Sequence, residues 1–153
     1  VPLRDIKIAD NGGFCGHALT VPPSLDPEFM SSGDWIKVKK RALILLGGQL
    51  AERVSGELAE MDGNADMAEL FRDAYSISSA SVEPGSDREV LREVVQLVFG
   101  QIGPESSEWL SGVEAEAEVI LIKQWQKVCS LAEMLIVKRV LCGDEATQVI
   151  QNA

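Results

Sequence analysis

The sequence is poor in the residue types that build covalent and metal sites. It has one histidine, His17, and three cysteines, Cys15, Cys129 and Cys142, without Cys-x-x-Cys spacing. An odd number of cysteines with no paired spacing is typical of free, mostly buried thiols in a reducing, intracellular compartment. No apolar run approaches the roughly 18 residues of a membrane span, so we expect a soluble chain with no membrane segment.

Basic residues are also few. Lysine and arginine number 14 against 24 aspartates and glutamates, which gives a net charge of -10. Because an acidic surface repels phosphate groups, nucleic acid and anionic lipid are poor partners. A Gly-x-x-x-x-Gly-Lys loop is absent, so any ATPase activity must belong to another chain or to another part of a longer protein. The 153 residues, 46% of them hydrophobic, are enough for a single globular domain over residues 1–153.

Apolar residues recur at three- and four-residue steps through most of the chain, as in amphipathic helices. The pattern predicts helices over residues 35–61, 65–75, 86–99, 107–141 and 144–152. Asp62-Gly63-Asn64 ends the first helix, Ser86 with Glu89 forms a capping box for the third, and Cys142-Gly143 ends the fourth. We therefore predict an all-α fold, a bundle of crossing helices with one long C-terminal helix.

The segments between these helices carry few strand signals. Residues 3–9 are typical of a short helix or a lead-in strand, and residues 14–20 of one or two helical turns. Three prolines make residues 21–34 a loop. Inside the first helix, Gly47 and Gly48 each cost about 1 kcal/mol against alanine, so we expect another backbone to pack closely there.

Three segments, in order along the chain, carry a family resemblance. The first is Gly13-Phe14-Cys15-Gly16-His17-Ala18-Leu19, which has the outline of His-Glu-Ala-Gly-His-Ala-Leu. The second is Leu46-Gly47-Gly48-Gln49-Leu50-Ala51-Glu52-Arg53-Val54, followed by Gly63-Asn64-Ala65-Asp66-Met67-Ala68. The third runs from Ile120-Leu121 through Leu131-Ala132-Glu133 to Leu141-Cys142-Gly143-Asp144-Glu145. Together they resemble the peptidase domain of the FtsH-type membrane-anchored AAA zinc proteases over most of the chain.

The resemblance implies a zinc site whose residues are only partly present. A zinc peptidase of this class needs two histidines one helical turn apart, a carboxylate beside the first as general base, and a third ligand. His17 occupies the position of the second histidine, and Asp66 occupies that of the third ligand. Glu52 occupies the position of a residue that contacts the metal ligands and orients them. Gly13 stands at the first histidine position and Phe14 at that of the general base.

These replacements should weaken the site. Gly13 offers no ligand and Phe14 cannot move a proton, so two ligands would hold zinc weakly. Loss of the base removes a step worth about 10²- to 10⁴-fold in rate. In a helix Cys15 would face about 200° away from His17, so it could ligate only from a non-helical turn. We expect His17 and Asp66 to face each other across a gap lined by Gly13 and Phe14.

Two further features of the family bear on this chain. A small β-hairpin and a substrate-edge strand lie between the positions of His17 and Glu52 in the family, and here the proline-rich loop takes their place. Family members form hexameric rings through this domain. The resemblance therefore implies protein partners, by self-association or by joining an AAA protease ring.

Each candidate residue also has an ordinary structural interpretation. His17 beside an apolar run is typical of a hydrogen-bonded structural residue, and Asp66 of a helix N-terminus favoured by the helix dipole. Glu52 and the run Glu114, Glu116, Glu118 are typical of solvated helix faces. Three functions are open: a pseudopeptidase that has lost zinc hydrolysis and acts through protein contacts, an active zinc metallopeptidase with an altered motif, and an unrelated helical interaction module. The first is our sequence-based prediction.

Overall fold

A computed structural model of the chain describes residues 3–8, 16–20, 32–80 and 85–153. These residues form six helices and three strands. They group into two compact units, which we call the terminal unit (Val1–Pro23 with Lys123–Ala153) and the central unit (Ser24–Ile122). The single domain predicted over residues 1–153 stays a prediction.

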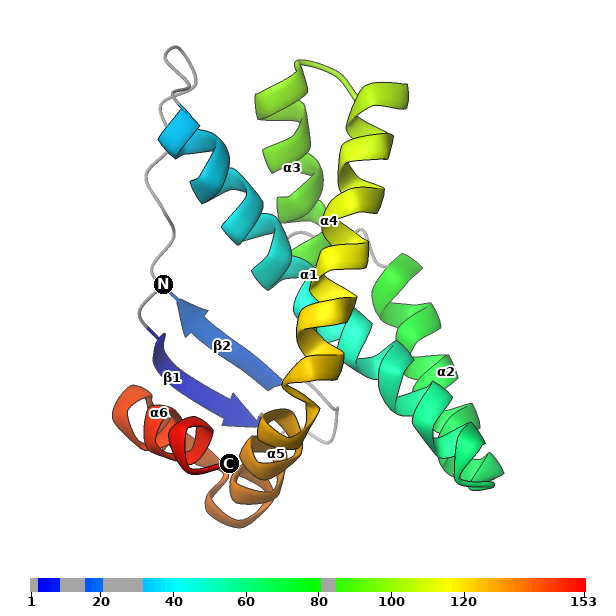
Figure 1. Ribbon diagram of the computed structural model, residues 1–153, viewed down its shortest axis with the longest axis vertical. Coiled ribbons are helices and arrows are strands. Elements are labelled where there is room, and N and C mark those ends of the chain that lie inside the picture. Colours follow the sequence, from blue (N-terminus) through cyan, green and yellow to red (C-terminus); the bar gives the residue numbers. More distant parts are fainter. Residues whose placement is uncertain (1–2, 9–15, 21–31, 81–84) are drawn as a thin grey trace. The chain divides into compact units, whose positions relative to one another are not determined.

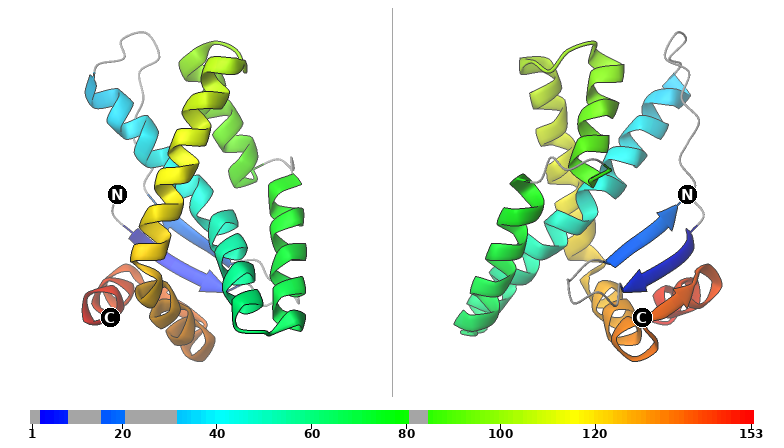
Figure 2. Two further views of the ribbon diagram at one scale, coloured as in Figure 1. Left: turned by 45° about the vertical axis from the view of Figure 1, so that its right-hand side comes forward. Right: turned by 180° about the vertical axis from the view of Figure 1, so that it is seen from behind.

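The central unit is helical. It contains α1 (Ser32–Met61), α2 (Ala65–Ala80), α3 (Asp87–Phe99) and nearly all of α4 (Pro104–Lys123). Helices α1 and α2 form one antiparallel pair, and α3 and α4 form a second pair that α1 crosses (Figures 1 and 2). The first three predicted helices are thereby confirmed, with α2 running on to Ala80.

Local sequence signals set the ends of these helices. Gly63 has a φ of 74°, which lets α1 reverse into α2. Ser86 Oγ accepts a hydrogen bond from the Glu89 backbone N–H at 3.3 Å, and the Glu89 carboxylate accepts one from the Gly85 N–H at 2.5 Å. Gly100, with a φ of 71°, ends α3. The capping predicted at Ser86 is confirmed.

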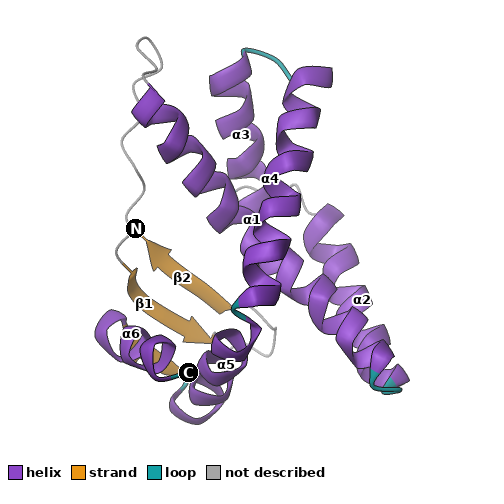
Figure 3. Cartoon of the chain, in the orientation of Figure 1, coloured by secondary structure: helices purple, strands orange, loops and turns teal. Residues whose placement is uncertain are grey.

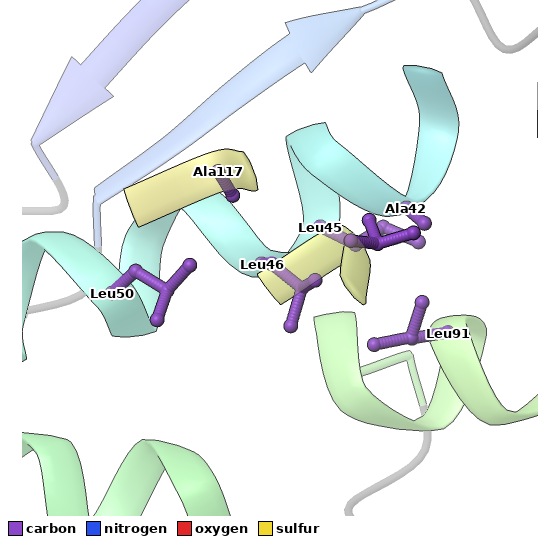
Figure 4. Close-up of a cluster of buried hydrophobic side chains, with 7 residues drawn as sticks. Ala42, Leu45, Leu46, Leu50, Leu91 and Ala117 are labelled. Atoms are coloured by element: carbon purple, nitrogen blue, oxygen red, sulfur yellow. The ribbon is translucent and has the colours of Figure 1, made fainter. Parts of the chain in front are cut away.

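A core of aliphatic side chains holds α1, α3 and α4 together. Figure 4 shows Leu45 and Leu46 of α1 near Leu91 of α3. The buried members of this core are Ala42, Leu45, Leu46, Leu50, Leu91, Val113 and Ala117. Three- and four-residue steps on α1 predict one apolar stripe of Leu43, Leu46, Leu50, Val54 and Leu58. Leu46, Leu50 and Val54 are buried, whereas Leu43 is partly buried and Leu58 is 37% exposed.

Among the described residues, the close backbone contact expected at Gly47 and Gly48 is not found. A Cβ built at either position meets no atom of the described residues within 4 Å. The close approach lies at Gly56, where a Cβ would be 3.4 Å from Phe71 Cβ and 3.7 Å from the Ala68 carbonyl oxygen, both on α2. Nothing in the sequence around these three glycines separates the one that packs from the two that do not.

Replacing Gly48 by alanine should raise the free energy of unfolding by about 1 kcal/mol, because alanine has the higher helix propensity and the position is open. Gly56→Leu is the matched contrast: it overfills the contact of α1 with α2 and should cost about 1–3 kcal/mol. Thermal unfolding followed by circular dichroism measures both. A loss of stability in Gly48→Ala would contradict the open environment of this glycine.

The terminal unit joins the two ends of the chain through a small antiparallel sheet (Figure 3). Its elements are β1 (Leu3–Ile8), β2 (Gly16–Thr20), α5 (Trp125–Lys138), β3 (Val140–Cys142) and α6 (Gly143–Asn152). The strand order is β2-β1-β3, and Ile6 in the middle strand stands opposite Ala18 on one side and Leu141 on the other. Leu141 is fully buried.

Several predictions about this unit are wrong. The helical turns predicted over residues 14–20 give way to a strand at Gly16–Thr20, and residues 14 and 15 lie outside the described ranges. The long C-terminal helix is interrupted at Gln124 and ends at Lys138, after which Arg139, with a φ of 64°, leads into β3. Gly143, predicted to end that helix, begins α6. The chain is mainly helical, as predicted, but pairing of β3 with distant β1 overrides the local helical pattern.

Candidate functional site

His17, the predicted second histidine of a zinc helix, lies on β2 with Lys7 of β1 as its partner across the ladder. A strand rises about 3.3 Å per residue, so positions four residues apart are separated by about 13 Å, against about 6 Å along a helix. Two histidines at that spacing on a strand could not share one zinc ion. Gly13, Phe14 and Cys15 lie outside the described residues, and their predicted roles stay predictions.

Asp66, the predicted third ligand, is an exposed residue in the first turn of α2. Just before it, the Asn64 side chain accepts a hydrogen bond from the Met67 backbone N–H at 3.2 Å and caps the helix. A carboxylate in the first turn stabilises a helix by about 0.3–1 kcal/mol through the helix dipole. Helix stability is thus a sufficient role for Asp66, in agreement with its ordinary structural interpretation.

Glu52, predicted to support the metal ligands, lies half-buried in α1 and has an interaction partner of its own. It belongs to the central unit together with Asp66, whereas His17 belongs to the terminal unit. The predicted meeting of His17 with Asp66 therefore stays a prediction.

The described residues do not offer a zinc site. No group of three or more His, Cys, Asp or Glu side chains gathers among them in a way that could hold a metal ion. Cys129 is half-buried and Cys142 exposed, both as free thiols, so the prediction of buried thiols is wrong for Cys142. Because a zinc peptidase site needs three protein ligands and an open fourth position, this donor set does not fit the metal.

An ion-pair cluster that the sequence pattern does not reveal joins α1 to α4. Arg53 of α1 pairs with Glu118 at 2.8 Å and with Glu114 at 3.4 Å, and its side chain is 27% exposed. Lys39, also on α1, pairs with Glu116. Glu114, Glu116 and Glu118, which we predicted to form a solvated helix face, therefore each have a cationic partner. No spacing rule identifies these partners, because they lie on a different helix.

In the terminal unit, an ion pair fixes the start of α6. Glu145 Oε1 accepts a hydrogen bond from Lys138 Nζ at 2.6 Å, and Glu145 Oε2 accepts one from the Cys142 backbone N–H at 3.0 Å. These hydrogen bonds, the one from Lys138 foremost, lower the pKa of Glu145 to about 2. Lys138 and Glu145 also line a groove of about 610 Å³ between α5 and α6.

The stability of α6 should depend on pH through Glu145. Because the pKa of Glu145 falls from 4.5 to about 2 on folding, its contribution is present above about pH 4.5 and is lost as the pH falls towards 2. Thermal unfolding of wild type and Glu145→Gln between pH 7 and pH 2 should show midpoints that differ at neutral pH and converge in acid. Glu133→Gln, at an exposed position on α5, is the charge-matched control. A difference that persists unchanged in acid would contradict this assignment.

Comparisons with protein-family models and with curated proteins found no match to this chain. Within the described ranges, none of the helices combines the length and the apolar composition that crossing a bilayer requires.

Proposed function

We propose that the chain is an FtsH-type metallopeptidase-like domain that has lost zinc hydrolysis and acts through protein–protein contacts. The observation that carries this proposal is the extended backbone of Gly16–Thr20, which pairs as a strand with β1. A segment paired in a sheet cannot also be the helix on which a zinc peptidase carries its two histidines. His17 therefore lacks the helical backbone of the second histidine in a zinc-peptidase motif.

The order of the elements supports the family resemblance in a shifted alignment. Strands β1 and β2 form an antiparallel pair before α1, and the family has its small β-hairpin before the helix that carries the Glu52 position. Gly47, Gly48 and Glu52 lie on α1, and Asp66 begins the next helix, as the resemblance implies. In this alignment His17 belongs to the second hairpin strand and not to the zinc helix.

The described residues alone do not supply the ligand set for metal-assisted hydrolysis. Asp66 alone supplies one carboxylate ligand, and a catalytic zinc needs two more protein ligands to hold it and to activate its water. Phe14, which takes the position of the general base when His17 is matched to the second histidine, has no group that accepts a proton. We expect such a domain to act by binding other proteins and not by hydrolysing them.

Exposed apolar side chains support a binding role. In the central unit, Met61 is 82% exposed and Ile77 72%, and in the terminal unit Ile136 is 66% exposed and Val137 80%. Ile136 and Val137 are adjacent on α5, and exposed apolar residues that gather in a patch are typical of interaction surfaces. The resemblance implies two kinds of partner for them: further copies of this chain, or the subunits of an AAA protease ring.

The test measures bound metal and proteolysis on the purified chain. After incubation with zinc and removal of free metal, mass spectrometry should find substoichiometric zinc in wild type, His17→Ala and Asp66→Asn, and none should cleave casein. Asp73→Asn, an exposed change on the same helix as Asp66, is the matched control. Stoichiometric zinc and cleavage that disappear in His17→Ala but survive in Asp73→Asn would establish the active metallopeptidase instead.

Light scattering supplies the second readout. The proposal expects a particle mass above the 16.6 kDa of one chain, or co-elution with an AAA protease ring on size-exclusion chromatography. A chain that stays monomeric, binds no ring and holds no zinc would favour the unrelated helical module.

A further inference from the structure

A groove of about 520 Å³ opens on the central unit where the start of α1, the end of α3 and the first half of α4 meet. Three aromatic side chains line it: Trp35 from α1, Phe99 from α3 and Trp109 from α4. We call this the aromatic groove. Its volume lies within the range of about 300–1,000 Å³ that is typical of ligand sites.

The three rings of the aromatic groove hold one another in place. The ring centroid of Trp35 lies 5.8 Å from that of Phe99 and 6.4 Å from that of Trp109, with interplanar angles of 69° and 63°. Phe99 and Trp109 are 5.7 Å apart. The two contacts of Trp35 are edge-to-face, and the Phe99–Trp109 pair is tilted, with all three centroid separations in the favourable range for aromatic pairs. None of the three residues is buried, and Trp35 is 39% exposed, so a fixed aromatic surface faces solvent.

The groove also carries an excess of negative charge. Glu105, Glu108 and Glu116 line it together with a single cation, Lys39, which pairs with Glu116. Glu105 and Glu108 lie one helical turn apart on α4, both exposed, and neither forms an ion pair within the part of the chain that the structure describes. Two carboxylates beside an aromatic surface are therefore available to an external cation.

We propose that the aromatic groove binds an arginine side chain presented by a basic protein segment. A guanidinium group stacks on an indole face within about 6 Å of the ring centroid and can also donate two parallel hydrogen bonds to a carboxylate. A purely apolar occupant would desolvate Glu105 and Glu108 without pairing them, which is unfavourable. The net charge of -10 adds long-range attraction for a basic partner. The inference depends on this groove alone and not on the metallopeptidase-like function.

Gly112 offers a way to close the groove while keeping the fold. It lines the groove one helical turn after Glu108, and a Cβ there would meet no atom of the described residues within 4 Å. A leucine side chain at this position would extend into open space that the ligand needs. Because leucine also has a higher helix propensity than glycine, Gly112→Leu should not lower the unfolding midpoint.

The test titrates the full chain with the peptide Gly-Ser-Arg-Gly-Arg-Ser-Gly and follows the tryptophan indole N–H signals by NMR. The signals of Trp35 and Trp109 should shift saturably. Trp125 of α5 does not line the groove, and its signal should stay in place. The same peptide with citrulline in place of arginine keeps the shape and loses the charge, and it should bind at least about tenfold more weakly, a difference of about 1.4 kcal/mol.

Three variants complete the test. Glu105→Gln combined with Glu108→Gln, and separately Gly112→Leu, should each weaken binding at least about tenfold. Glu69→Gln combined with Glu93→Gln removes the same charge outside the groove and should leave binding unchanged. Absence of a saturable shift in wild type, equal affinity for the citrulline peptide, or equal losses in the two double variants would each overturn the proposal. Unfolding midpoints verify that every variant is folded.

Discussion

Replacing Leu50 by alanine is expected to lower the free energy of unfolding by about 2–5 kcal/mol. Leu50 is 0% exposed and belongs to the aliphatic core of α1, α3 and α4 (Figure 4). The truncation removes buried apolar atoms and leaves a cavity that the surrounding helices can close only in part. Urea unfolding followed by circular dichroism measures the change from the midpoint and the slope.

Ile36 provides the matched control for this experiment. It lies on the same helix and is 57% exposed, so Ile36→Ala should change the free energy of unfolding by no more than about 0.5 kcal/mol. Equal effects of the two substitutions would contradict the position of the core. An unchanged slope in both variants would show that the same surface is exposed on unfolding.

Replacing Leu141 by alanine is expected to lower the free energy of unfolding of the terminal unit by about 2–5 kcal/mol. Leu141 is 0% exposed, and it stands opposite Ile6 where β3 pairs with β1. Ala146 of α6 is also fully buried, so the described interior of this unit is small and one large side chain is a substantial share of it. Loss of Leu141 should therefore open the sheet and release α6.

Hydrogen exchange measures the effect of this substitution separately in the terminal unit and in the central unit. In Leu141→Ala, backbone amides of β1, β3 and α6 should lose protection, while those of α1, α3 and α4 should keep it. Val140→Ala, at a neighbouring position that is 46% exposed, is the control and should leave the protection pattern unchanged. Equal loss of protection across the whole chain would show that the two units unfold as one cooperative structure.

The helices of the central unit could be predicted because residues within a few positions of each helix end determine where the helix ends. Gly63 and Gly100 supply positive φ angles where α1 and α3 end, and Ser86 with Glu89 caps α3. Such signals act over three or four residues, and the sequence displays them directly. The contact at Gly56 is different, because it depends on which part of α2 meets α1 and not on the residues beside it.

The sheet could not be predicted for a related reason. Val140, Leu141 and Cys142 follow a helical pattern without a break, and Gln124, where the predicted helix is interrupted, is neither a glycine nor a proline. What makes residues 140–142 a strand is β1, at the other end of the chain. Long-range pairing of this kind overrides local propensity.

For the candidate site, the sequence supplied residue types but not their geometry. His17 attracts attention as the sole histidine, yet its role depends on whether residues 16–20 form a helix or a strand. Arg53 is one of 14 basic residues, and only the crossing of α1 with α4 shows that it lies beside Glu114 and Glu118. The aromatic groove likewise collects Trp35, Phe99 and Trp109 from three separate helices.

The discontinuous terminal unit has a consequence for the order of folding during synthesis. Strand β3 leaves the ribosome long after β1, and the entropic cost of closing so long a loop rises with the logarithm of its length. The central unit is continuous in sequence and can fold first, which shortens the loop that remains to be closed. We therefore expect the helices to assemble cotranslationally and the sheet to be completed last.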